Sequence, residues 1–230
     1  MIDPEFIVAR LPRLFEGFQV TVQLTAITLA LGLALAIPLG IARALGPWWL
    51  NAPILAYTFF FRGTPLLVQL YLIYYGSGQF RAELEAVGLW WLFRDPWYCA
   101  LLTFTLSTTA YTTEILRGAI LAVPRAQREA ARAFGMNHWQ SYRSIILPQS
   151  FAYALPAYKN EVIFQLQATA LVSLITVADL TGNATVIANR TFRHYEMYLT
   201  AAVFYLVAVY GLLMVLTVIE RRLTRHLRPG

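Results

Sequence analysis

Residues 129–148 read EAARAFGMNHWQSYRSIILP, a charged and helix-prone stretch with a glycine in the middle. It lies between long apolar runs, and the positions of those runs decide how the chain folds. The chain has 230 residues, of which 58% are hydrophobic and only 13% are charged. Soluble domains usually carry about 25% charged residues. The composition is therefore typical of a protein that crosses a membrane several times.

About 20 apolar residues of helix cross the hydrocarbon layer of a membrane. On this basis we predict an all-α membrane protein with five transmembrane helices, forming one domain over residues 1–230. The spans are expected at about residues 19–43, 53–76, 97–116, 155–178 and 197–219. Residues 117–154 then form a long loop that contains the quoted stretch. Residues 4–18 have the apolar face of a helix that lies in the bilayer interface.

Arginine positions orient the chain, because cytoplasmic segments are enriched in Lys and Arg. An odd number of spans puts the two ends on opposite sides. Arg10 and Arg13 precede the first span, but two larger clusters outweigh them. These clusters are Arg117, Arg125, Arg128, Arg132 and Arg143 in the loop, and Arg221, Arg222, Arg225 and Arg228 at the end. We expect the N-terminus outside and the C-terminus in the cytoplasm, which also explains the net charge of +6 without nucleic acid.

The first part of the quoted stretch is expected to form a helix from Gln127 to Phe134, because it contains good helix formers. Glu129 stands beside two small residues, Ala130 and Ala131. Small residues allow close approach of backbones, and a short helix of this kind can enter a groove on another protein. The alternative is an ordinary solvated helix with an unremarkable pair of alanines.

The second part of the stretch follows Gly135, which permits a turn that other residues resist. From Trp139 to Leu147 the apolar side chains form one face of a further helix. We expect Pro148 to end that helix, because proline lacks the backbone N–H that a helix interior needs.

Several polar residues lie inside the predicted spans, where a charge costs about 2.5–3.5 kcal/mol at the centre. Such residues usually face a cavity or a partner. The candidates for a solute path are Arg62, Gly63, Thr64, Pro65, Gln69, Glu114, Asn160, Glu161, Gln165, Gln167 and Thr169.

Each of these candidates also has a purely structural interpretation. A break at Pro65 would line the path or bend the helix. The alternative is that Arg62 lies near the cytoplasmic mouth and is bound to backbone carbonyls. Glu114 either faces solute or forms a local pair with Arg117. Glu161, Gln165 and Thr169 share one helix face, which lines either a solute cavity or a buried polar seam between subunits.

Several motifs resemble those of a known family. Glu-Ala-Ala, a glycine four residues later and a terminal Leu-Pro look like the EAA loop of ABC importer permeases. Other motifs resemble those of the polar amino acid branch of this family. They are YTTEI at 111–115, RGAI at 117–120, FRGTPL at 61–66, LPAY at 155–158 and NEVI at 160–163. The resemblance covers about residues 21–222 and is greatest to permeases for basic amino acids and opines, of the M type.

The resemblance implies a type I importer domain in the bacterial inner membrane. Its partners would be a Q-type paralogue or a second copy, an ATPase dimer and an extracytoplasmic amino acid binding protein. The coupling residues implied are Glu129, Ala130, Ala131, Arg132, Gly135 and Pro148, with Glu129 facing an ATPase groove. The chain contains no G-x-x-x-x-G-K phosphate-binding loop. ATP and Mg are therefore expected on the partner, with no cofactor, metal or catalysis on this chain.

One residue departs from the family pattern, since many relatives have lysine where this chain has Gln167. A neutral amide there, together with Glu161, favours a cationic substrate. The competing function is an ATP-independent carrier or channel that uses Glu114 and Glu161 for ion coupling. Such a carrier has no reason for a docking helix and usually shows internal repeats, which this chain lacks. A scaffold without transport does not explain the polar residues in the spans.

Overall fold

The computed structural model describes residues 3–223, and no strand occurs among them. The elements are α1 (Pro4–Leu45), α2 (Trp48–Gly63), α3 (Leu66–Tyr74), η1 (Gly76–Phe80), α4 (Arg81–Ala86), α5 (Trp90–Phe93), α6 (Pro96–Ala122), α7 (Arg125–Ala133), α8 (His138–Ser141), η2 (Tyr142–Ile146), α9 (Leu147–Ala168), η3 (Thr169–Ile175), α10 (Leu180–Thr191) and α11 (His194–Leu223). The predicted all-α class is confirmed. Arg225 and Arg228 of the predicted basic cluster lie outside the described residues.

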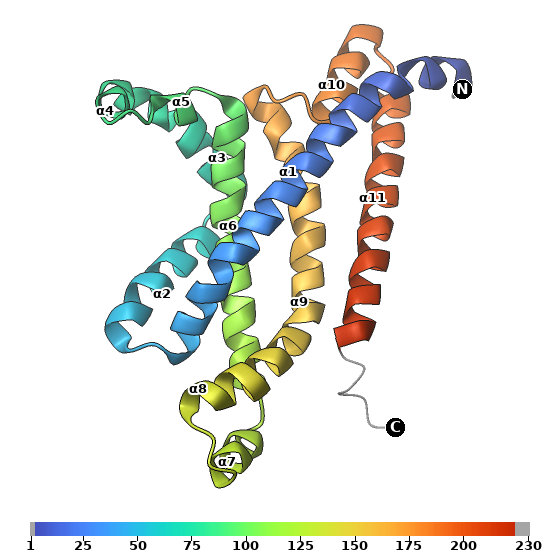
Figure 1. The fold of residues 1–230 in the computed structure, drawn as a ribbon. Helices are drawn as coiled ribbons and strands as arrows, with labels where there is room; N and C mark the ends of the chain where they lie inside the picture. The colour runs from blue at the N-terminus through green and yellow to red at the C-terminus, as the bar shows by residue number, and fades with distance from the viewer. Residues whose placement is uncertain (1–2, 224–230) are drawn as a thin grey trace.

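Helix α1 crosses the molecule as a long diagonal (Figure 1). Its 42 residues correspond to roughly 63 Å at 1.5 Å per residue. The separate interfacial helix expected at residues 4–18 is instead the first part of this helix. Asp3 caps its start and accepts a hydrogen bond from the Phe6 N–H at 3.2 Å. Pro12 is tolerated inside it.

Small residues let α1 lie directly against α6. Gly32, Ala36 and Gly40 recur every four residues and are buried. A Cβ atom at Gly40 would come within 2.8 Å of the Leu116 Cβ, which is closer than Cβ contacts allow. Glycine is therefore required at this crossing, as at other close helix contacts in membranes.

The second predicted span is two helices with a break between them. Helix α2 ends at Gly63, Thr64 is extended at φ −112° and ψ 143°, and Pro65 precedes α3. The predicted interruption at residues 62–65 is confirmed. The extended conformation follows from proline, which disfavours helical geometry in the residue before it.

The expectation that Pro148 ends a helix was wrong. Helix α8 continues through the π-helical η2 segment into α9, and Pro148 lies in the first turn of α9. In η2 the Leu147 N–H bonds to the Tyr142 carbonyl, five residues back. This widened turn accommodates a proline within a continuous helix, since proline has no N–H to place and needs room for its ring.

Helix α9 ends in a short 3₁₀ segment that stops at Thr176, whose φ is +68°. Helix α10 then starts at Leu180 and is capped by Asp179, whose carboxylate accepts the Gly182 N–H at 2.8 Å. Among the described residues, two helices are long and apolar enough to span a membrane, α1 and α11, or three if the bent pair His138–Ile175 and Leu180–Thr191 is one span. The first turn of α1 and the last turn of α11 lie at opposite ends of the molecule (Figure 1).

Candidate functional site

Helices α7 and α8 form a hairpin that projects from the end of the molecule opposite α4, α5 and α10 (Figure 1). Helix α7 covers Arg125–Ala133, close to the predicted range. It ends in a Schellman turn, in which the Gly135 N–H donates to the Arg132 carbonyl at 2.9 Å and the Met136 N–H to the Ala131 carbonyl at 3.0 Å. Gly135 has φ +76°, so the predicted turn is present.

The second arm of the hairpin starts with a capping box. The Gln140 N–H donates to Asn137 Oδ1 at 2.9 Å, and the Asn137 N–H donates to Gln140 Oε1 at 2.9 Å. Reciprocal bonds of this kind fix the start of a helix. The hairpin therefore has a defined geometry of its own, and its second arm runs without interruption into α9.

The surface of the hairpin differs from the docking face expected at residues 129–131. Glu129 and Ala130 are exposed, but Ala131 is only 2% exposed. The small side chain of Ala131 thus serves packing within the chain. Sequence reasoning missed Phe134, which is 88% exposed, while Trp139 is 69% exposed.

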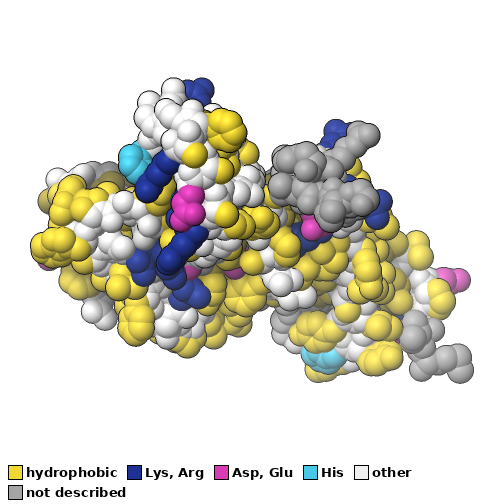
Figure 2. All heavy atoms as spheres, turned by 90° about the horizontal axis from the view of Figure 1, so that it is seen from below, with side chains coloured by type: hydrophobic (Ala, Val, Ile, Leu, Met, Phe, Trp, Pro, Cys, Tyr) yellow, Lys and Arg dark blue, Asp and Glu magenta, His cyan; other side chains and the backbone are white. Residues whose placement is uncertain are grey.

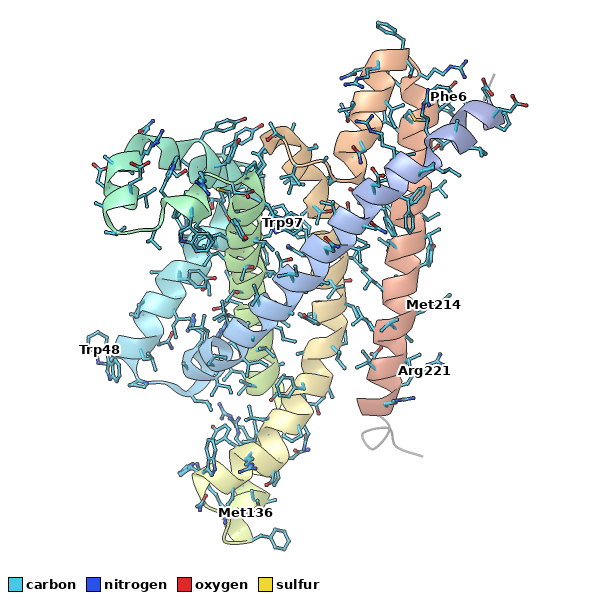
Figure 3. All side chains as sticks on the ribbon, turned by 45° about the horizontal axis from the view of Figure 1, so that its top comes forward. Phe6, Trp48, Trp97, Met136, Met214 and Arg221 are labelled. Carbon is cyan, nitrogen blue, oxygen red and sulfur yellow. The ribbon has the colours of Figure 1, made fainter. Side chains whose placement is uncertain are left out.

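Figure 2 shows this end of the molecule, where Lys and Arg side chains gather beside acidic ones. The hairpin and the helix after it supply Arg125, Arg128, Arg132 and Arg143. Met136 lies at the tip of the hairpin (Figure 3). Two exposed aromatic side chains amid basic residues are typical of the centre of a protein–protein interface, where aromatic residues and Arg are enriched.

The α2–α3 break is held open by one buried side chain. Gln69 Nε2 donates to the Phe61 carbonyl at 2.8 Å, to the Thr64 carbonyl at 3.0 Å and to Thr64 Oγ1 at 2.8 Å. Backbone carbonyls freed by a helix break need such partners. Gln69 is 3% exposed, so in this structure the predicted path residue binds the backbone at the break.

A hollow of about 300 Å³ opens at the break. It is lined by Phe61, Arg62, Gly63, Thr64, Pro65, Leu66, Ser107, Tyr111 and Phe164. The Arg62 guanidinium lies 5.4 Å from the centre of the Tyr111 ring, a distance typical of a cation–π contact. The structure thus brings together the four predicted path residues 62–65 and adds aromatic side chains of α6 and α9.

Glu114 lies elsewhere, in a cluster of charges that joins three helices. Its carboxylate is 3.0 Å from Arg43 Nε of α1 and 2.7 Å from Arg117 Nε of α6. Thr58 Oγ1 of α2 donates to it at 3.3 Å. The expected pair with Arg117 is present, and Arg43 is a partner that sequence reasoning missed. Two cationic neighbours stabilise a carboxylate, so the Glu114 carboxylate is engaged in ion pairs within this chain.

The three residues of the predicted polar face of α9 are buried together. Glu161, Gln165 and Thr169 are 6%, 1% and 0% exposed, and Gln165 Nε2 donates to Thr28 Oγ1 of α1 at 3.0 Å. These three side chains are therefore buried within this chain, and the expected seam between subunits is not formed by a surface that they expose. Asn160 and Gln167 are exposed instead.

Comparison with known proteins shows to which family this chain belongs. Residues 20–228 match the family described as binding-protein-dependent transport system inner membrane component. The chain belongs to this family.

Two curated relatives resemble this inner membrane component over almost their whole length. The nopaline transport system permease protein NocM of Agrobacterium fabrum strain C58 is 39% identical, with 99% of this chain and 94% of the relative covered. The histidine/lysine/arginine/ornithine transport system permease protein HisM of Escherichia coli strain K12 is 41% identical, with 94% and 91% covered.

The fold of this inner membrane component has been solved in other transporters. A crystal structure of an amino acid ABC transporter with histidines superposes with a TM-score of 0.84 at 32% identity, covering 96% of this chain and 99% of that one. An inward-facing MetNI methionine ABC transporter superposes with a TM-score of 0.77 at 19% identity, covering 94% and 98%, which shows the fold alone. The predicted type I importer fold is confirmed.

Proposed function

We propose that this inner membrane component is the permease subunit of an ATP-driven importer for basic amino acids or opines, and that the α7–α8 hairpin docks onto a separate ATPase. The hairpin carries this proposal. It projects beyond the other helices (Figure 1) and presents Phe134 and Trp139 largely exposed. ATP and Mg would be held by the ATPase, because this chain has no phosphate-binding loop.

The proposed topology has five spans, formed by α1, α2 with α3, α6, α9 with η3, and α11. The N-terminus is placed outside and the C-terminus and hairpin in the cytoplasm. Support comes from the opposite positions of the first turn of α1 and the last turn of α11 (Figure 1) and from the basic side chains around the hairpin (Figure 2). Cytoplasmic segments are enriched in such residues.

The mechanism proposed is alternating access. Closure of the ATPase dimer displaces the hairpin, and the continuous helix from His138 through η2 carries that displacement into α9. Helix α9 carries Phe164, which lines the hollow at the α2–α3 break. Movement at the hairpin would thus change access to the break.

The proposed substrate carries a basic side-chain group. The relatives NocM and HisM carry nopaline and histidine, lysine, arginine or ornithine in their names. On the exposed face of α9, Asn160 and Gln167 are neutral amides on either side of Phe164. Arg62 at the hollow can bind the α-carboxylate that all amino acids share, since guanidinium pairs well with carboxylate.

The partners proposed are an ATPase dimer, an extracytoplasmic amino acid binding protein, and either a Q-type paralogue or a second copy of this chain. The hollow lies at the surface of a single chain, which supports a second membrane subunit that completes the path. No observation favours the ATP-independent carrier, and the ion pairs of Glu114 remove one of the two carboxylates it requires.

Purification from native membranes followed by reconstitution tests this function. The complex should contain an ATPase, and vesicles should take up labelled arginine only with ATP and binding protein present. Equal uptake of glutamate and arginine would contradict the preference for a basic side-chain group. Uptake without ATP, or the absence of an ATPase under mild conditions, would contradict the importer.

A further inference from the structure

Four helices line an open hollow of about 410 Å³ that the transport mechanism does not use. It lies toward the end of the molecule that carries the hairpin, because Pro148 at the start of α9 is part of its wall. Its wall includes Leu33 of α1, Ile115 of α6, Phe151 and Leu155 of α9, and Leu216 and Ile219 of α11.

The chemistry of the wall shows what can fill this space. Only Thr112 and Tyr158 bring polar side chains to it. Protein interiors leave few voids larger than a water molecule, and cavities with apolar walls stay dry. In a bilayer the available apolar material is the acyl chain of a lipid. The volume lies within the range of about 300–1,000 Å³ that is typical of small-molecule sites.

A charged pair links α11 to α9 beside the hollow. Lys159 of α9 forms an ion pair with Glu220 of α11 and donates to Thr217 Oγ1 at 3.2 Å. Each member of the ion pair is the direct neighbour of a wall residue, Tyr158 on α9 and Ile219 on α11. The pair therefore bridges the two helices at the edge of the hollow, so that the space is a built feature of the fold.

Basic residues follow the hollow at the end of α11. Arg222 is three residues beyond Ile219, which puts both on the same face of the helix, and its side chain is exposed. Arg221 lies beside it near the lower end of α11 (Figure 3). Basic pockets between transmembrane helices on the cytoplasmic side bind anionic lipid headgroups.

We propose that this hollow is a binding site for one anionic phospholipid, with an acyl chain between α9 and α11 and its phosphate at Arg222. The inference rests on the proposed topology, which places this end of α11 at the cytoplasmic leaflet. The acyl chain would pack against the apolar wall, and the anionic headgroup would bind the basic side chain at the end of α11.

The test uses the assembled complex, purified in mild detergent and titrated with phosphatidylglycerol or phosphatidylcholine, with bound lipid counted by native mass spectrometry. Leu216→Trp fills the hollow from its α11 wall and should lower occupancy about tenfold. Val215→Trp is the matched control, because Val215 is 57% exposed and is not part of the wall. It should bind like wild type.

A second pair of variants tests the headgroup without touching the packing. Arg222→Glu should reduce phosphatidylglycerol binding about fivefold and phosphatidylcholine binding little, since a basic residue near the surface attracts anionic lipid. Arg94→Glu, at an exposed position on the opposite end, should change neither.

Three results would overturn the site: equal occupancy in both tryptophan variants, no retained phospholipid in wild type, or equal affinity for the two lipids. Because lipid is counted directly, the outcome is independent of uptake. Failure of ATP-driven uptake in wild-type vesicles would instead count against the proposed function.

Discussion

Pro65 and Pro148 each stand at the start of a helix, yet the chain breaks before the first and is helical through the second. The residue before Pro65, Thr64, is extended at φ −112° and ψ 143°. The residue before Pro148, Leu147, is helical at φ −61° and ψ −46°. At the first site Gln69 binds the freed carbonyls, and at the second a π-helical turn accommodates the proline.

This difference matches the two tasks that the proposed function assigns to the regions. The α2–α3 break gives a polar backbone opening beside a hollow, as a solute path requires. The segment from α8 into α9 stays one helix and can transmit displacement from the hairpin. Helix continuity is thus adjusted locally, by a side-chain partner at one proline and by hydrogen-bond register at the other.

The largest effect is expected from a substitution in the turn between α7 and α8. Gly135→Val places a β-branched residue at φ +76°, and left-handed geometry costs a residue with a Cβ about 1–2 kcal/mol. Uptake should fall at least about tenfold, and ATPase should co-purify less. Gly118→Ala is the control, because a Cβ at Gly118 in α6 meets nothing within 4 Å. Normal uptake by the valine variant would contradict the role of the turn.

The next effect is expected at the break. Gln69→Leu keeps the size of the side chain but removes the donor to two backbone carbonyls and one hydroxyl. A buried acceptor without a partner costs about 1–3 kcal/mol. Thermal unfolding of the purified complex should therefore shift to lower temperature, with reduced uptake. Val68→Ala, at a 46% exposed position, should shift it less; an equal shift would refute the bridging role.

A smaller effect is expected from softening the helix between hairpin and α9. Arg143 and Ser144 are both exposed within η2. Changing both to glycine costs about 1 kcal/mol of helix stability each, whereas alanine favours helix. The glycine pair should import about two- to fivefold fewer molecules per ATP hydrolysed than the alanine pair. Identical ratios would show that stiffness here is irrelevant to transport.

The smallest effect is expected from Pro148→Ala. Because the helix already passes through this position, restoring an N–H should leave uptake within about twofold of wild type. The proline causes no break that its removal could repair. Loss of uptake by tenfold or more would mean that the π-helical turn itself is needed for coupling.

Sequence reasoning predicted the features that depend on local chemistry. The break at Pro65 and the turn at Gly135 follow from residues whose backbone preferences are strong. Pro148 was misjudged because a π-helical turn has no signature in an apolar pattern. The burial of Ala131 was missed because exposure depends on how α7 lies against the rest of the chain.

Contacts between residues far apart in the sequence could not be predicted either. Arg43 is 71 positions from Glu114, and a single sequence shows no link between them. The same is true of Gln165 and Thr28, which are 137 positions apart. Helix periodicity identified the shared face of Glu161, Gln165 and Thr169 but could not distinguish a cavity from a seam, because both patterns place polar groups inside.

Cysteine cross-linking tests the central claim, that the hairpin docks onto an ATPase. The natural Cys99 is buried and is replaced by alanine. Single cysteines are placed at Ala130, which is exposed, and at Ala131, which is 2% exposed. If the hairpin docks, Ala130→Cys should form a cross-link to the ATPase, and the yield of that cross-link should change when ATP is added. Ala131→Cys should give a much lower yield. An active importer in which neither cysteine reaches the ATPase would contradict the account.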